Sequence, residues 1–193
     1  MTSGSASNRF PTSLYVAAGI AIVYWLLYQL NDWLFTNFEV SKSISWIFLP
    51  AAIRVIAVLL FGWEGVAGLL FGSIVMAFPW HGDASVNSCF VSVLSSISPM
   101  LAVTSGAYLM KTKPDLHGLG AKQLFVFALL GALFNSALQN MYFQLSGTAQ
   151  SWLAGLVPMF VGDFIGTMIV LYCVSMLIRY SLRRAAKQPP SLS

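Results

Sequence analysis

Apolar residues occur along this chain in long continuous runs, and polar residues gather between them. The runs predict six helices, at about 13–34, 44–61, 66–79, 89–110, 124–145 and 152–182. Most of them approach the roughly 20 residues that a helix needs to cross the hydrocarbon core of a bilayer. Continuous runs also argue against a β-barrel, whose strands alternate lipid-facing and interior residues. The pattern therefore predicts an all-α, polytopic membrane bundle with six transmembrane helices.

The polar ends of the chain divide it into three parts. Residues 1–11 are polar and rich in serine, and residues 183–193 carry basic residues and paired prolines. We expect both segments to be disordered tails around one transmembrane domain at 12–182. Charged residues make up 8% of the chain, against about 25% in a soluble domain. A separate soluble catalytic domain is therefore not expected.

Basic residues predict the orientation in the membrane. With six crossings, both termini lie on the same side, and positively charged loops face the cytoplasm. Only Lys42 falls on the opposite side. The segments on the terminal side hold Arg9, Lys111, Lys113, Lys122, Arg179, Arg183, Arg184 and Lys187. We therefore expect a multi-pass protein of the bacterial inner membrane with both termini cytoplasmic, and no nucleic-acid partner.

The stretch 43–78 predicts a helical hairpin on which the other helices assemble. Its two apolar runs are hinged at 62–65. The second run carries Gly68 and Gly72, a spacing of small residues that lets another helix approach closely. Ala17 and Ala21 give the first predicted helix a similar face. These four residues are the predicted helix-packing positions.

Polar residues at similar depths in separate helices indicate a site inside the bilayer. Arg54 lies within the second run, and a charge there costs on the order of 3 kcal/mol on insertion scales. Asp163 is expected at a similar depth in the last helix. Asn135 and Gln139, four residues apart, share one helical face. Two interpretations stay open: a buried Arg54–Asp163 pair beside a ligand cavity lined by the amides, or cross-links that only lock helices together.

The remaining polar residues do not predict catalysis. No nucleophile is spaced for activation by a base, so we expect no enzyme, no catalytic residue and no cofactor. His81 and His117 fall on opposite sides of the predicted membrane and cannot share a metal. Cys89 and Cys173 are expected about 30 Å apart in depth, too far for a disulfide.

Two motifs resemble the membrane-associated sensor domains of the first MASE type. The stretch 48–52 (FLPAA) stands where that family has Trp-Pro-Pro-Ala-Gly, and two glycines follow at the family's spacing. The stretch 162–166 (GDFIG) is similar to the family's Gly-Asp-x-x-Gly signature in its last span. The positions that carry the resemblance are Pro50, Gly62, Gly72, Gly162, Asp163 and Gly166.

The chain also departs from that family. Phe48 and Ala52 replace the motif's tryptophan and glycine, and the family is often drawn with about eight spans. No cyclase or kinase follows residue 193. The resemblance therefore implies a stand-alone sensory or partner-binding module that relays its signal to a separate protein.

Two other functions remain as alternatives. Substrate-binding subunits of energy-coupling-factor vitamin transporters are also small six-helix proteins, and dock their partner through an Ala-x-x-x-Ala face that Ala17 and Ala21 resemble. That similarity implies a small-solute ligand. The other alternative is an accessory subunit of a larger membrane complex. The expected partners are the lipid bilayer together with another membrane protein or a second copy of the chain.

Overall fold

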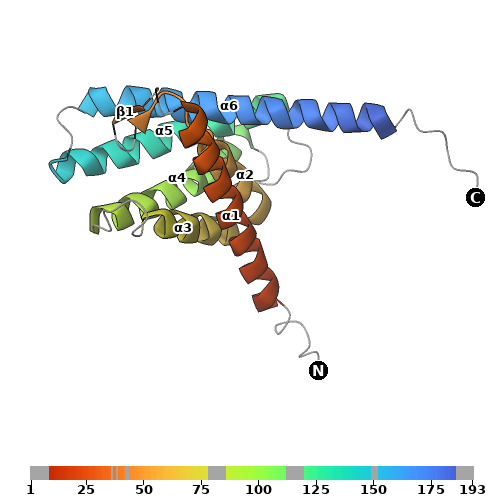
Figure 1. Ribbon diagram of the computed structural model, residues 1–193, viewed down its shortest axis with the longest axis horizontal. Helices are drawn as coiled ribbons and strands as arrows, with labels where there is room; N and C mark the ends of the chain where they lie inside the picture. The colour runs from red at the N-terminus through yellow and green to blue at the C-terminus, as the bar shows by residue number, and fades with distance from the viewer. Residues whose placement is uncertain are drawn as a thin grey trace, which may run out of the picture.

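The computed structural model describes residues 9–35, 37, 39–41, 44–77, 86–111, 120–148 and 152–185. This part of the chain forms six helices and one two-stranded antiparallel sheet (Figure 1). The elements are α1 (Arg9–Phe35), β1 (Glu39–Ser41), β2 (Ile44–Ser45), α2 (Pro50–Phe61), α3 (Trp63–Ala77), α4 (Val86–Met110), α5 (Ala121–Leu145) and α6 (Trp152–Ala185). Most of the two predicted tails, and the loops that hold His81 and His117, lie outside the described residues.

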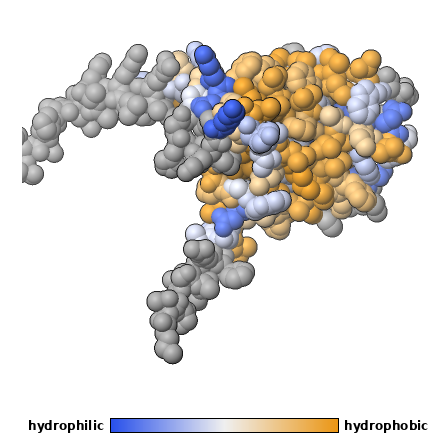
Figure 2. All heavy atoms as spheres, turned by 180° about the vertical axis from the view of Figure 1, so that it is seen from behind, coloured by the Kyte–Doolittle hydropathy of each residue, from blue (hydrophilic) through white to orange (hydrophobic). Residues whose placement is uncertain are grey.

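Four helices, α1, α4, α5 and α6, are long and apolar enough to cross a membrane. Apolar residues cover most of the broad body of the molecule in Figure 2, and polar residues lie mainly toward its edges. Such an apolar exterior suits lipid and would be a liability in water. The chain is therefore a polytopic helical membrane protein, as the sequence predicts.

The short helix α2 lies at the centre of the bundle and contacts each of the other five helices. Eight of its twelve residues are buried. The apolar core forms around it from residues of α1, α2, α3, α4 and α5, with Val55, Val58, Leu69, Val103 and Phe127 among its members. At about 1.5 Å per residue, α2 is roughly 18 Å long and shorter than the hydrocarbon core.

The predicted start of the second helix, at residue 44, is wrong. Residues 44–49 form β2 and a non-helical segment that bends at Trp46 and turns at Leu49, and α2 begins at Pro50. Proline suits the first helical position because its missing N–H needs no partner there. The backbone N–H of Phe48 donates to the Gly162 carbonyl, and that of Leu49 donates to Asn31 Oδ1. These bonds give the N–H groups of Phe48 and Leu49 partners although the residues before Pro50 are not helical.

Glycines on one face of α6 leave room for the backbone of residues 44–49 to pack against that helix. A methyl group at Gly162 would collide with the Ser45 carbonyl, and one at Gly166 with the Phe48 carbonyl. At Gly155 it would lie 3.0 Å from the Ile44 side chain. The spacings of seven and four residues place all three glycines on the same helical face. At the Gly-Asp-x-x-Gly motif, the backbone of residues 45–49 therefore packs directly on α6.

The hinge between the two central helices is shorter than predicted. Only Gly62 leaves helical geometry, with φ of 54°, a backbone conformation that favours glycine. Trp63 and Glu64 already belong to the first turn of α3, and Ser13 Oγ of α1 donates to the Glu64 carboxylate. A methyl group at Gly65 would collide with the Ala57 carbonyl. Glycines thus permit both the tight turn and the close α2–α3 contact.

The four predicted helix-packing residues meet in one contact between α1 and α3. A methyl group at Gly68 would lie 2.9 Å from the Ala17 carbonyl oxygen. One at Gly72 would lie 3.1 Å from Ala21 Cα. The small residues of the two helices therefore face each other, and they allow the close backbone approach typical of membrane helix pairs.

Adding one methyl group to the α6 glycine face should destabilise the protein. In Gly166→Ala the new Cβ meets backbone atoms of Phe48 and Leu49, which cannot rotate away. Overpacking of this kind costs about 1–3 kcal/mol. We expect a lower thermal unfolding midpoint for the purified protein in detergent.

Gly19→Ala is the matched control, because nothing lies within 4 Å of its added methyl group. Alanine also favours a helix over glycine by up to about 1 kcal/mol. The control should unfold at the same temperature or higher. Equal midpoints for Gly166→Ala and Gly19→Ala would contradict the packing of residues 45–49 on α6.

Candidate functional site

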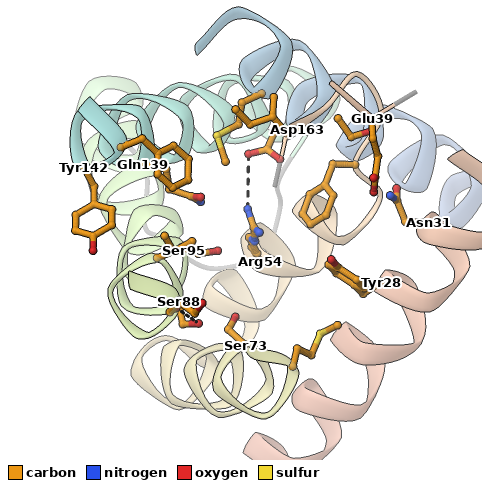
Figure 3. A pocket seen from close by; sticks show the side chains of 18 of the residues that line it. Tyr28, Asn31, Glu39, Arg54, Ser73, Ser88, Ser95, Gln139, Tyr142 and Asp163 are labelled. Carbon is orange, nitrogen blue, oxygen red and sulfur yellow. Dashed lines mark hydrogen bonds and ion pairs between the residues drawn. The ribbon is translucent and has the colours of Figure 1, made fainter. Parts of the chain in front are cut away.

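A cavity of about 580 Å³ lies between the helices and opens at one end of the bundle. Its lining comes from α1, β1, β2, α2, α3, α4, α5 and α6 and from the segment after β2. Figure 3 shows labelled side chains from these elements converging on the cavity. Volumes between about 300 and 1,000 Å³ are typical of small-molecule sites.

The floor of the cavity, as we use the term, is the pair Arg54 and Asp163. Arg54 Nη1 lies 3.6 Å from Asp163 Oδ2, and both side chains are more than nine-tenths buried. Figure 3 shows the guanidinium of α2 pointing across the cavity toward the carboxylate of α6. Because α2 begins at Pro50, Arg54 lies only about one turn from its end. Arg54 reaches this depth because the non-helical residues 45–49 precede it, and not because it lies in the middle of a long helix.

Aromatic side chains surround the Arg54 guanidinium. Its Nη2 donates to the Tyr24 hydroxyl at 3.1 Å. Its central carbon lies 4.9 Å from the ring centre of Phe48 and 5.8 Å from that of Tyr24. Cation–π contacts of this kind contribute about 2 kcal/mol when water is excluded. They help to offset the cost of burying a charge.

Asp163 is held in place by a chain of amides. Asn135 Nδ2 donates to Asp163 Oδ2, while Asn135 Oδ1 accepts from Gln139 Nε2 at 2.7 Å and from Ser98 Oγ at 3.2 Å. All four predicted site residues, Arg54, Asp163, Asn135 and Gln139, therefore belong to one connected polar network. Arg54, Asp163 and Gln139 line the cavity itself, whereas Asn135 lies behind them.

Some donors at the floor and on the adjoining α4 wall form no hydrogen bond, although one of them, Arg54 Nη1, is the atom of the ion pair. Arg54 Nε and Nη1 and Ser95 Oγ are buried and have no hydrogen-bond partner among the described residues. Buried polar groups are rarely left in this state, and each costs about 1–3 kcal/mol. Ser95 projects from α4 and points toward Arg54 in Figure 3. The unused donors therefore face one another across the floor.

A stripe of serines on α4 forms one wall. Ser88, Ser92 and Ser95 follow a spacing of four and three residues and all line the cavity. This spacing places them on one helical face. The hydroxyl of Ser92 donates to the Ser88 carbonyl at 2.9 Å. The three serines therefore make this wall polar, and their small side chains leave space in the cavity.

The open end of the cavity carries negative charge. Asp32 at the end of α1 and Glu39 of β1 both line it and are both exposed. Exposed Asn87 and Thr148 complete this rim, the name we use for these four residues. Among described lining residues, three are carboxylates and one, Arg54, is cationic. The cavity is thus acidic overall, with a neutral ion pair at its floor.

Sequence reasoning found the charged floor but missed much of its surroundings. Tyr24, Phe48 and Asn31 all contact the floor or the segment that carries it, and none was assigned a role. The α4 serine stripe had a detectable signal, since polar residues at helical spacing in an apolar run are unusual. The signal for Phe48 was hidden, because residue 48 was assigned to a helix.

The other predicted residues serve packing or lie apart from the cavity. Gly62, Gly72, Gly162 and Gly166 permit a turn or close contacts, as described above, and Pro50 starts α2. The motif glycines therefore have structural explanations, and of the six motif positions Asp163 is the one that lines the cavity. Cys89 and Cys173 are free and exposed.

No protein-family model, curated protein or solved structure matches the chain. The relationship to MASE-type sensor domains that the motifs suggest therefore stays a prediction.

The ion pair should show energetic coupling. Arg54→Ala leaves Asp163 buried with one hydrogen bond from Asn135, and losing one partner of a buried pair costs about 3–5 kcal/mol. Removing the second charge as well, in Arg54→Ala with Asp163→Ala, should recover part of that loss. Unfolding of the wild type and three variants in the same detergent measures the coupling.

Arg54→Ala combined with Ser105→Ala is the control. The Ser105 hydroxyl bonds within α4, to the Leu101 carbonyl, and does not line the cavity. The two effects should add within about 0.5 kcal/mol. A double variant of Arg54 and Asp163 that is equally additive would show that the two charges do not interact.

Proposed function

We propose that this protein is a membrane receptor module that binds a small polar organic solute in its cavity. The observation that carries the proposal is the open cavity with unused hydrogen-bond donors at its floor. A pair of charges that only locked helices together would sit in a closed bundle, whereas Arg54 and Asp163 line a cavity of about 580 Å³. Mostly apolar walls with a few convergent polar groups are the general pattern of ligand sites.

In this proposal the module is sensory and relays to a separate protein. The resemblance to MASE-type domains supports a sensory role, and Asp163 of the Gly-Asp-x-x-Gly motif lines the cavity. The non-helical segment 45–49 contacts α1 through Asn31 and α6 through Gly162. A solute that bound Arg54 would therefore act on a segment touching two long helices. One of them, α6, runs well beyond the bundle in Figure 1 and offers a route to a partner.

A substrate-binding subunit of a small-solute transporter is the second candidate, because it needs the same open cavity. The face formed by Ala17 and Ala21 does not support it. These residues pack on Gly68 and Gly72 of α3 within the chain, so this face is not free for a transport partner. Nothing in the described cavity favours an accessory role without a ligand.

Binding should stabilise the purified protein, and filling the cavity should abolish the effect. We would screen amino acids, amines, carboxylates, sugars and vitamins by thermal unfolding. A compound at about 100 times its Kd adds about 2.7 kcal/mol, which raises Tm by several degrees. Ser73→Phe adds a ring on the α3 wall and should remove the response.

Thr104→Phe is the control for Ser73→Phe, because Thr104 is exposed on α4 and does not line the cavity. It should respond to the same compounds as the wild type. If no compound raises Tm, or if the response survives Ser73→Phe, the proposed function is wrong.

We further propose six crossings, with the cavity opening on the outer face and both termini cytoplasmic. The exposed residues Lys111 and Lys122 lie at the ends of α4 and α5 that are away from the acidic rim, which fits the positive-inside rule. Segment 44–49 with α2, and α3 after it, would complete the two short crossings.

Labelling of single cysteines in intact cells tests this orientation. With Cys89 and Cys173 replaced by serine, Thr148→Cys at the rim should react with a membrane-impermeant maleimide added outside. Lys111→Cys should react only after the cells are lysed. The reverse pattern would show that the cavity opens to the cytoplasm.

A further inference from the structure

We propose that the floor of the cavity binds the zwitterionic head group of a free α-amino acid with an aromatic or large apolar side chain. Its carboxylate is received by Arg54 and Ser95, and its ammonium by Asp163. This inference rests on the proposed function and names the class of solute.

The unused donors assign the carboxylate. Arg54 Nε and Nη1 and Ser95 Oγ are buried, lack hydrogen-bond partners among the described residues, and belong to residues lining the cavity. Arg54 as a residue is 7% exposed and Ser95 is 4% exposed, so both are held within the protein rather than solvated at its surface. Guanidinium N–H groups form charge-assisted hydrogen bonds with carboxylates. One N–H of Arg54 and the Ser95 hydroxyl can each donate to one of the two carboxylate oxygens.

The carboxylate of Asp163 assigns the ammonium. Its ion pair with Arg54 and its hydrogen bond from Asn135 both use Oδ2. Neither of these contacts occupies Oδ1, which can accept from a cationic N–H. Because Asp163 lines the cavity, a ligand that contacts Arg54 has this oxygen close by.

Charge balance at the floor favours a zwitterion over either single ion. A lone anion beside Arg54 would also meet Asp163, and a lone cation beside Asp163 would meet Arg54, so each gains one attraction and suffers one repulsion. In an α-amino acid both charges are attached to one carbon, through bonds of about 1.46 and 1.52 Å, and so lie about 3 Å apart. That spacing resembles the 3.6 Å between Arg54 Nη1 and Asp163 Oδ2. A net-neutral ligand therefore meets both protein charges with complementary ones.

The walls and the rim of the cavity determine which amino-acid side chain the ligand can carry. Among the described residues, five aromatic ones line the cavity: Tyr24, Tyr28, Phe48, Tyr142 and Phe143. They provide apolar area for an aromatic or large apolar side chain. Asp32 and Glu39 at the rim repel a ligand with net negative charge, so acidic amino acids should bind poorly.

Three probes with one common body test the assignment. L-phenylalanine carries both charges, 2-phenylethylamine only the ammonium, and 3-phenylpropionate only the carboxylate. Binding to the purified wild-type protein in lipid nanodiscs would be measured by isothermal titration and by thermal unfolding. We expect L-phenylalanine to bind at least tenfold more tightly than either analogue, and more tightly than L-glutamate.

Two substitutions on neighbouring positions of α4 locate the contact. Ser95→Ala removes a hydroxyl that has no protein partner, so the fold should tolerate it while the affinity for L-phenylalanine falls roughly tenfold. Ser96→Ala is the control, since its hydroxyl bonds to the Ser92 carbonyl at 2.7 Å and does not line the cavity. Its affinity should stay unchanged. Arg54→Lys, which keeps the charge but loses the guanidinium N–H groups, should also weaken binding.

Each other outcome overturns the inference. Binding of 2-phenylethylamine alone would make the cavity a cation site governed by its acidic rim. Binding of 3-phenylpropionate alone would leave Asp163 without a role. In both cases the proposed function stands and the zwitterion assignment falls. If none of the three probes binds, the assignment is also wrong, and the proposed function is decided separately by the wider panel and Ser73→Phe.

Discussion

The contact between the non-helical segment 45–49 and the glycine face of α6 governs both the fold and the site. Glycines at 162 and 166 let backbone meet backbone, and the Phe48 N–H donates to the Gly162 carbonyl at 3.0 Å. Asn31 holds the next residue from the side of α1. This arrangement starts α2 at Pro50 and brings Arg54 opposite Asp163. A buried charge is costly in a membrane, and here its countercharge is supplied by the helix that seats the segment.

The same contact explains why a cavity exists. A helix through residues 44–61 would extend α2 toward the rim and fill space between α1, α4 and α6. Residues 44–49 instead form β2 and a short non-helical segment, which leaves room beyond the N-terminal end of α2. Small side chains on α4, Ser88, Ser92 and Ser95, widen that room. The small α4 serines leave the site open, and aromatic residues hold Arg54 beside it. The result is an open polar site in an otherwise apolar bundle.

Hydrophobic runs were sufficient to predict the class of protein and the positions of most helices, because bilayer thickness imposes length and composition. They could not predict where helix 2 starts, since residues 44–49 are as apolar as the helix that follows. Their non-helical form depends on partners far along the chain, Asn31 and Gly162. Arg54 and Asp163 could be paired from depth alone, because a lone charge in lipid requires a partner. The roles of Tyr24 and Phe48 depend on three-dimensional placement and had no comparable signal.

The central claim is that Arg54 and Asp163 meet as an ion pair at the floor of the cavity when the protein lies in a bilayer. Solid-state NMR measures this most directly, through dipolar coupling between ¹⁵N-labelled Arg54 and the ¹³C-labelled carboxyl of Asp163 in lipid. The account predicts a measurable coupling, equivalent to a nitrogen–carbon separation of about 4–5 Å, as expected when nitrogen and oxygen lie within about 4 Å. Absence of coupling, with both side chains well ordered, would place the charges apart and contradict the account.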